Sequence, residues 1–155
     1  MAARTSADIN PYTNQPFSAN YEAVRKQTEN LPVVKHLPSL IESVKIHQVV
    51  VVVGETGSGK STVLPKEIMS QLLPEGSKLA LTQPRQLAAS RVAERIAESV
   101  DMPIGSVVGV RFRGRDETSL MTRLEVLTDG QPRMFTLSMV SRSQYSRTPR
   151  TASHV

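Results

Sequence analysis

Hydrophobic positions along this chain follow two different periods, which predict helices alternating with strands. Three stretches carry apolar side chains every three or four residues, the spacing of amphipathic helices. These expected helices cover residues 34–46, 60–73 and 86–100. Four shorter stretches are apolar and rich in β-branched residues, as buried strands require. The expected strands cover residues 49–53, 78–82, 107–112 and 123–128. This alternation predicts the α/β class with a parallel sheet.

The residues before this region are polar and rich in turn formers. Residues 10–17 contain Pro11 and Pro16, and each proline biases the residue before it away from helix, so we expect an extended segment. Ser18 is expected to cap a short helix that runs to Asn30, because its hydroxyl can accept a hydrogen bond from the first turn.

The pattern changes character after Gly130. Residues 131–155 contain eight serines or threonines, two prolines and four arginines, without a periodic apolar pattern. This composition predicts a disordered basic tail. Two other interpretations stay open: a tail that binds nucleic acid or accepts phosphate, and a chain that has lost its proper continuation. The expected organisation is an N-terminal helical extension over residues 1–33, an α/β domain over residues 34–130 and the tail.

Composition limits the classes of protein to which the chain can belong. Its 155 residues, 39% of them hydrophobic, suffice for one modest domain with a core. The sequence has no cysteine, which excludes disulfides and thiolate metal sites. No apolar run approaches the roughly 20 residues that span a bilayer. The first ten residues also lack the apolar region of a secretory signal, so we expect no membrane partner.

The formal net charge of +5 is concentrated towards one end of the chain. Residues 131–155 hold four arginines and no acidic residue, so residues 1–130 have 15 basic and 14 acidic side chains and a charge of +1. The total charge therefore does not by itself predict binding to nucleic acid, which must be argued from individual residues.

The most specific chemical signal lies between the valines of residues 49–53 and the helix that follows. Residues 54–61 read Gly-Glu-Thr-Gly-Ser-Gly-Lys-Ser, which matches the phosphate-binding pattern G-x-x-x-x-G-K-[ST]. Glycines let the backbone turn and point successive N–H groups at a phosphate, and a helix that starts here adds its positive end. A chance match in a turn is the alternative, but the expected strand and helix on either side favour the functional interpretation.

Two side chains of this loop have expected chemical roles. Lys60 supplies positive charge for the terminal phosphates and for the transition state, and Ser61 offers a hydroxyl to Mg²⁺, which prefers oxygen ligands. The candidate nucleotide-binding residues of the loop are Gly54, Glu55, Thr56, Gly57, Ser58, Gly59, Lys60, Ser61 and Thr62.

Two further motifs accompany the loop. Thr82-Gln83-Pro84-Arg85 follows the second expected strand, and Thr128-Asp129-Gly130 ends the fourth. Together with the loop, and in this order, they resemble the motifs of the DEAH-box RNA helicases of pre-mRNA splicing and ribosome biogenesis. The likeness extends over residues 10–130 and includes the lead-in Asn10-Pro11-Tyr12-Thr13 and the segment Leu31-Pro32-Val33.

The resemblance implies an incomplete RecA-like domain that uses ATP and Mg²⁺. It implies single-stranded RNA as a partner, with helicase activator proteins or spliceosome components, in the nucleus. Lys60 and the backbone of residues 57–59 would hold the β- and γ-phosphates. Arg95 would stack on adenine, which suits a planar guanidinium. An ordinary helix charge paired with Glu94 or Glu98 is the alternative.

The resemblance also implies that Arg85 and Thr128 hold the RNA backbone, at the carboxyl edge of the sheet where ligands of open α/β folds bind. Phosphate and sugar contacts carry no sequence information, so little sequence preference is expected. As isolated residues, both would be ordinary turn residues. Other arginines depart from the family pattern and favour a solvated charged turn at residues 113–119 over RNA contacts. They are Arg111, Arg113, Arg115 and Arg123.

Some parts of the family pattern have no counterpart in this sequence. No Asp or Glu occurs after Asp129, so the Asp-Glu-Ala-His motif that handles Mg²⁺ and the attacking water is absent. We therefore expect nucleotide binding and weak RNA binding without a complete catalytic set. A truncated or frame-disrupted gene product is the hypothesis for the change at Gly130. Two alternatives stay open: a non-enzymatic helicase-derived interaction fragment, and an unrelated small phosphate-loop NTPase or kinase.

Overall fold

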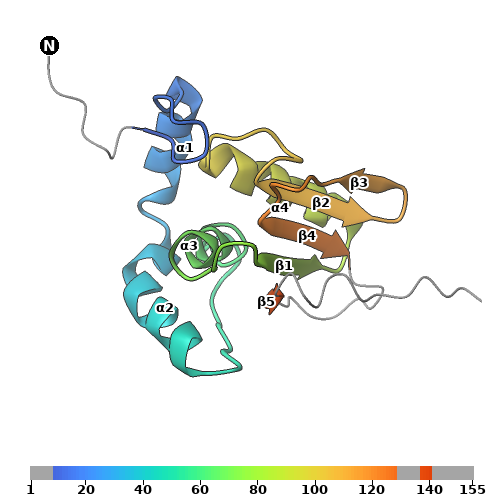
Figure 1. Ribbon diagram of the computed structural model, residues 1–155. Coiled ribbons are helices and arrows are strands. Elements are labelled where there is room, and N and C mark those ends of the chain that lie inside the picture. The colour runs from blue at the N-terminus through green and yellow to red at the C-terminus, as the bar shows by residue number, and fades with distance from the viewer. Residues whose placement is uncertain (1–8, 129–136, 141–155) are drawn as a thin grey trace, which may run out of the picture.

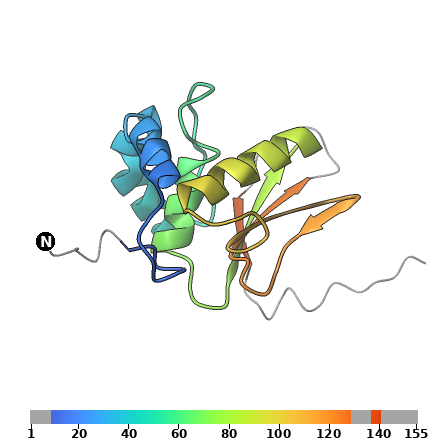
Figure 2. The same ribbon diagram turned by 90° about the horizontal axis from the view of Figure 1, so that it is seen from above.

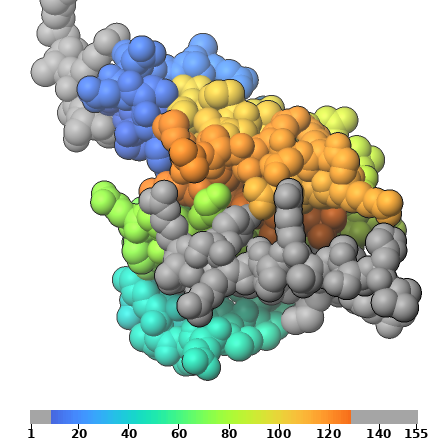
Figure 3. All heavy atoms as spheres, turned by 45° about the vertical axis from the view of Figure 1, so that its right-hand side comes forward, coloured from blue at the N-terminus to red at the C-terminus, as the bar shows by residue number. Residues whose placement is uncertain are grey.

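The computed structural model describes residues 9–128 and 137–140 as a mixed α/β fold, which confirms the expected class (Figure 1). The helices are α1 (Ala19–Thr28), the 3₁₀ helix η2 (Pro32–His36), α2 (Leu37–Ile46), α3 (Val63–Gln71) and α4 (Gln86–Ser99). The strands are β1 (Lys78–Gln83), β2 (Val108–Phe112), β3 (Arg115–Glu117), β4 (Leu124–Thr128) and β5 (Leu137–Val140). Helices α1 and α2 lie at opposite ends of the molecule (Figure 3). No helix in this part of the chain is long and apolar enough to cross a membrane.

Five strands form one sheet in the order β3-β2-β4-β1-β5. The three inner strands are parallel, with Leu79 of β1 and Val108 of β2 both opposite Leu124 of β4. The edge strands β3 and β5 run antiparallel to their neighbours. The expected parallel sheet is thus confirmed for its centre, where α4 provides the crossover between β1 and β2 that parallel strands require.

Helix α4 covers one face of the sheet and forms the core with it (Figure 2). Its apolar positions recur at helical spacing, which places Ala89, Ala93 and Ile96 on the sheet side at 0% exposure. The strand residues in this core are also at 0% exposure: Leu79, Leu81, Val108, Val110, Leu124 and Val126. Small alanines on the helix let it approach these larger strand side chains closely, as the packing density of protein interiors requires.

The expected helices are confirmed, with shifted bounds. Ser18 is the N-cap of α1, and its Oγ accepts a hydrogen bond from the Tyr21 N–H at 3.2 Å. The helix expected over residues 34–46 divides into η2 and α2, because Pro38 has no N–H to continue the ladder of the preceding turn. Helix α3 begins at Val63, after a turn that completes the preceding loop.

The strand expected over residues 49–53 does not form, and this expectation is wrong. The five valines lie outside the sheet, and no backbone hydrogen bond joins them to another described residue. The sheet edge beyond β1 is paired with β5 instead. A β-branched run favours extended backbone, but it does not supply a neighbouring strand, so the local pattern overstates the tendency to enter a sheet.

Residues 10–17 form a tight loop, and the expectation of an extended segment is wrong. Asn10 Oδ1 accepts the Tyr12 N–H at 2.9 Å, and the Asn10 N–H donates to the Gln15 carbonyl at 2.8 Å. Asparagine side chains commonly stabilise turns in this way, and here the bond outweighs the local bias of the prolines.

Two short strands were not expected. The charged turn at residues 113–119 contains β3, which pairs with β2. Within the tail expected over residues 131–155, Leu137–Val140 form β5, so the expectation of disorder is wrong there. The backbone groups of β1 at the sheet edge give this segment a strand to pair with. The other tail residues lie outside the described residues.

The N-terminal loop is fastened to the carboxyl end of α4. The buried Asn10 side chain donates from Nδ2 to the carbonyls of Val100 and Asp101, at 3.1 and 3.2 Å. The Asp101 carboxylate accepts from the Ser18 N–H at 2.8 Å and from Ser18 Oγ at 2.6 Å. These bonds hold α1 beside the end of α4, where Figure 2 shows it.

Asn10→Ala is expected to lower the free energy of unfolding by about 1–3 kcal/mol, because it leaves carbonyls at the end of α4 without their donor. Urea unfolding measures the change. Asn20→Ala is the matched control, since Asn20 is exposed on α1 and alanine is the better helix former. Equal losses of unfolding free energy in the two variants would contradict a stabilising role for the Asn10 hydrogen bonds.

Candidate functional site

The loop between residues 49–53 and α3 depends on its glycines. Gly57 and Gly59 have φ values of 82° and 92°, in the left-handed region that residues with side chains rarely adopt. Residues 60–62 continue the turn up to Val63, where α3 begins. The positive amino end of α3 therefore follows directly on the loop.

Several backbone N–H groups of the loop are available to a ligand. Within the described residues, the amides of Gly57, Gly59, Lys60 and Ser61 donate to no carbonyl or side chain. The amides of residues 62–64 are already bonded to the Gly59 carbonyl. A group of unbonded amides at the start of a helix is the donor set that phosphate oxygens accept.

Lys60 lies across the mouth of the loop. Its Nζ donates to the carbonyls of Gly54 and Glu55 and, at 3.0 Å, to Ser58 Oγ. An ammonium has three N–H donors, so the loop itself occupies all of them. A phosphate would replace these neutral acceptors with a charged one, which makes a stronger hydrogen bond.

A cavity of about 450 Å³ adjoins the loop. Residues 51–53, η2 and α2 line part of it, and the loop lines the rest with Gly54, Glu55, Ser58 and Lys60. Ser61, the expected metal ligand, makes no hydrogen bond through its hydroxyl to any described residue. No cluster of three metal-ligating side chains occurs in the described part of the chain. The donors fit a phosphate whose own oxygens, with Ser61, would hold Mg²⁺.

The 3₁₀ helix η2 supports the loop from the N-terminal side. The Val33 N–H donates to the Ser58 carbonyl at 3.0 Å. A Cβ on Gly59 would lie 2.8 Å from Val33 Cγ1 and 3.2 Å from Leu31 Cδ1. Gly59 is therefore needed both for the turn and for this close contact.

Arg95 projects from α4 towards the N-terminal helix. Its Nη1 donates to Glu98 Oε2 at 3.1 Å, and its Nη2 donates to Gln27 Oε1 of α1 at 2.6 Å. The ion pair with Glu98, which the sequence offered as the alternative to stacking on adenine, is thus present. The Arg95 side chain is 34% exposed, so part of its guanidinium stays accessible. Gln27 precedes Leu31 by four residues, so one short segment connects Arg95 to the phosphate loop.

The two residues expected to hold RNA lie at the carboxyl edge of the sheet. Gln83 ends β1 opposite Thr128, which ends β4, and Arg85 is the N-cap of α4 two residues later. The Arg85 side chain is exposed and has no hydrogen bond or ion pair to the described residues. The buried Gln83 Nε2 also has no partner among them, which is unusual for a buried donor. This edge therefore offers a cation and an amide donor.

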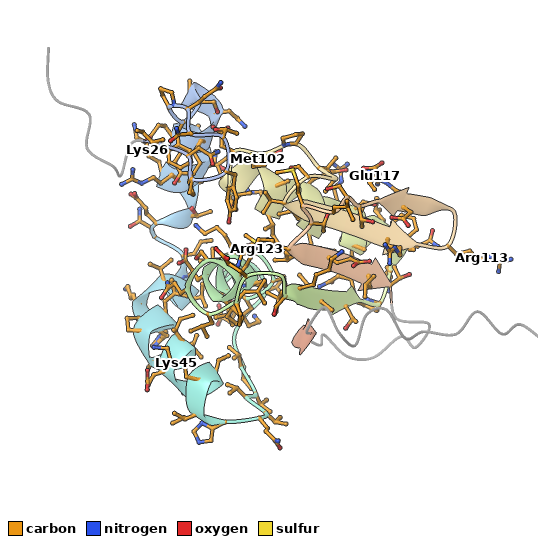
Figure 4. All side chains as sticks on the ribbon, in the orientation of Figure 1. Lys26, Lys45, Met102, Arg113, Glu117 and Arg123 are labelled. Atoms are coloured by element: carbon orange, nitrogen blue, oxygen red, sulfur yellow. The ribbon has the colours of Figure 1, made fainter. Side chains whose placement is uncertain are left out.

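The arginines of the β2–β3 hairpin have partners within the protein, with one exception. Arg111 Nη1 lies 2.9 Å from the buried carboxylate of Glu125, and Arg115 Nε lies 2.9 Å from Glu117 Oε1. The hydrogen bond from Arg115 holds the pKa of the Glu117 carboxyl below its usual range. Arg113 points away from the sheet at the hairpin tip (Figure 4). These pairings support the solvated charged turn rather than a basic RNA surface.

Arg123 also serves the fold. Its Nη2 donates to the Leu73 carbonyl at 2.7 Å, which ties β4 to the end of α3. The pKa of the Tyr12 hydroxyl is raised, because its burial outweighs the opposing effect of the Arg123 charge.

The nucleotide and RNA candidates occupy two separate places. The loop and Arg95 are connected through η2 and α1, whereas no hydrogen bond or ion pair among the described residues joins Arg85 or Thr128 to the loop. Sequence reasoning missed Gln27 and the unpartnered Gln83 amide. The contact of Gln27 with Arg95 spans 68 residues, so no local pattern indicates it.

A glycine-dependent loop with unbonded amides, at the start of a helix in an α/β fold, has the sequence and the donor set of a phosphate-binding loop. No protein-family model matches the sequence. The pre-mRNA-splicing factor ATP-dependent RNA helicase DEAH10 of Arabidopsis thaliana is 39% identical to it over 119 residues, which are 76% of this chain and 16% of that protein.

Solved structures give the same class. Two crystal structures of Escherichia coli HrpB, one named a DExH-box NTPase and one a DEAH/RHA helicase, match with TM-scores of 0.60 and 0.61 at 39% and 38% identity. The matches cover 64% and 65% of this chain, but only 12% and 13% of the HrpB chains. The comparisons therefore support a fragment of a DEAH-box helicase that contains part of a RecA-like domain, and the chain spans a small share of the length of these relatives.

Gly59→Ala is expected to destabilise the protein more than Gly57→Ala. A positive φ costs an alanine about 1–2 kcal/mol at either position, but only a methyl group on residue 59 would collide with Val33. Urea unfolding measures both losses. Gly76→Ala is the control, because Gly76 has a φ of 74° and open space around it, and it should match Gly57→Ala. Similar losses in all three variants would argue against the support of the loop by η2.

Proposed function

We propose that this chain binds a nucleotide with Mg²⁺, with the phosphates held by residues 54–62. The observation that carries the proposal is the group of unbonded amides at Gly57, Gly59, Lys60 and Ser61, beside the Lys60 ammonium. Backbone donors, a point charge and the positive end of α3 all favour a ligand with negative charge. Ser61 would give the metal ion one oxygen ligand, and the phosphates would give others.

The relatives make ATP the proposed nucleotide, because one is named an ATP-dependent RNA helicase and one an NTPase. The proposed process is RNA remodelling in pre-mRNA splicing or ribosome biogenesis, in the nucleus. The proposed partners are single-stranded RNA and helicase activator proteins or spliceosome components. For the 155 residues themselves we propose binding without rapid turnover, because hydrolysis needs carboxylates for the metal ion and the attacking water, and no Asp or Glu follows Asp129.

Lys60→Ala is expected to weaken binding of a fluorescent ADP analogue by roughly tenfold or more, because a hydrogen bond to a charged group contributes about 1.5–3 kcal/mol. Fluorescence titration measures the affinity. Lys45→Ala is the matched control, since Lys45 is exposed on α2 and paired with Glu42. Equal affinity in Lys60→Ala and the unchanged chain would refute phosphate binding at this loop.

Arg95→Ala is expected to weaken ADP binding while leaving the affinity for inorganic tripolyphosphate unchanged. A cation stacked on an aromatic ring contributes about 0.5–2 kcal/mol, so the loss should be roughly two- to thirtyfold. Arg91→Ala is the matched control, because Arg91 lies one turn earlier on α4 with its side chain 78% exposed. A parallel loss for tripolyphosphate would show that Arg95 does not act on the base.

Arg85→Ala is expected to reduce the salt dependence of single-stranded RNA binding. Each neutralised phosphate contributes a slope of about −0.7 to log K against log salt, so one lost contact should remove about that amount. Arg113→Ala, at the solvent-exposed hairpin tip, should change the slope less. Binding that does not respond to salt in the unchanged chain would contradict the RNA proposal.

A further inference from the structure

Arg95 is held by two residues that belong to two different helices. Its Nη1 donates to Glu98 Oε2 at 3.1 Å, about one turn further along α4. Its Nη2 donates to Gln27 Oε1 at 2.6 Å, and Gln27 lies in the last turn of α1. The two ends of the guanidinium fork are therefore fixed from two sides of the contact between α1 and α4.

These two hydrogen bonds determine how the plane of the guanidinium is oriented. All its N–H donors lie in one plane, so acceptors bind at its edge and leave its two faces for a ring to stack on. The bond to Glu98 alone would let the group turn about that bond. The second bond, to a residue on another helix, prevents this rotation. The Arg95 side chain is 34% exposed, so a planar ligand can still reach it.

Gln27 is a fixed partner because α1 is itself fixed against α4. At the start of α1, Ser18 donates to the Asp101 carboxylate from its N–H at 2.8 Å and from its Oγ at 2.6 Å. In the middle of α1, Val24 is buried at 4% exposure. Gln27 follows Val24 by three residues, so the two side chains lie on one side of the helix. The position of the Gln27 oxygen is therefore determined by the packing of the whole helix.

We propose that Gln27 is a positioning residue for the nucleotide base, because its side-chain oxygen holds the guanidinium plane of Arg95 in the orientation on which the base stacks. The inference rests on the nucleotide binding and on the role of Arg95 proposed above. It adds that α1 acts on the affinity for the base and not on the affinity for the phosphates. A guanidinium that is already oriented loses less conformational freedom when the ring binds, so binding costs less free energy.

The alternative is a hydrogen bond that only stabilises the contact between α1 and α4. In that role Gln27 would contribute to the free energy of unfolding, and its loss would affect every ligand of the chain equally or none of them. A positioning role instead predicts an effect that is confined to ligands with a base and that disappears when Arg95 is removed.

Gln27→Ala is expected to weaken ADP binding roughly two- to tenfold, the effect of losing one hydrogen bond, and to leave the affinity for inorganic tripolyphosphate unchanged. Titration with a fluorescent ADP analogue, and its displacement by tripolyphosphate, measure the two affinities. Gln27 is exposed and alanine is a better helix former, so α1 should stay folded. Gln71→Ala is the matched control, because the exposed Gln71 bonds to Glu67 of its own helix, and it should change neither affinity.

A double-variant cycle decides whether Gln27 acts through Arg95. In the Arg95→Ala background, Gln27→Ala should have no further effect on ADP affinity, because no guanidinium is left to orient. Gln27→Glu should bind ADP at least as tightly as the unchanged chain, because it keeps an oxygen of the same reach and bonds more strongly to the guanidinium. Equal losses from Gln27→Ala with and without Arg95, a parallel loss of tripolyphosphate affinity, or a Gln27→Glu variant as weak as Gln27→Ala would each overturn the proposal.

The same titrations distinguish failure of this inference from failure of the proposed function. An unchanged chain that does not bind ADP, or that binds it no more tightly than Lys60→Ala, would refute nucleotide binding and the role of Gln27 with it. ADP binding that needs Lys60 and Arg95 but is the same in Gln27→Ala would leave the proposed function in place and overturn the role of Gln27 alone.

Discussion

The hydrogen bond from the Val33 N–H to the Ser58 carbonyl, 3.0 Å long, holds the candidate phosphate loop, residues 54–62, against the N-terminal segment of the chain. The contact of Gly59 with Val33 and Leu31 reinforces it, since this space admits no side chain on the loop. The valines before the loop are not part of the sheet, so they do not fix its position. The geometry of the loop therefore depends on η2 on one side and α3 on the other.

Because it supports the loop, the N-terminal segment contributes to the candidate site as well as to the fold. At its start, Asn10 and Ser18 bind the end of α4 through hydrogen bonds of 2.6–3.2 Å. Further along, Gln27 accepts a hydrogen bond from Arg95, and η2 then reaches the loop. A single hydrogen bond contributes only about 1 kcal/mol to stability, so the N-terminal segment is held in position by all of these hydrogen bonds together. The segment joins the residues proposed for the base to those proposed for the phosphates.

Much of the fold could be predicted from the sequence, because the helices and central strands follow their own local periodicity. Ser18 and the glycines of the loop also act on adjacent backbone, so their effects could be predicted from the sequence. The position of residues 49–53 outside the sheet could not be predicted, because a run of valines indicates strand propensity but not whether a neighbouring strand exists. The pairing of Arg95 with Gln27 depends on packing between α1 and α4, which a local pattern does not describe.

The central claim is that residues 54–62 and the N-terminal segment form one nucleotide site. Amide hydrogen exchange of the full chain, with and without ADP and Mg²⁺, tests it most directly. The account predicts slower exchange at the loop amides of Gly57, Gly59, Lys60 and Ser61, which are unbonded without ligand, and at residues 27–33, which support them. Unchanged exchange at residues 57–61 in saturating nucleotide, or protection confined to other parts of the chain, would contradict the account.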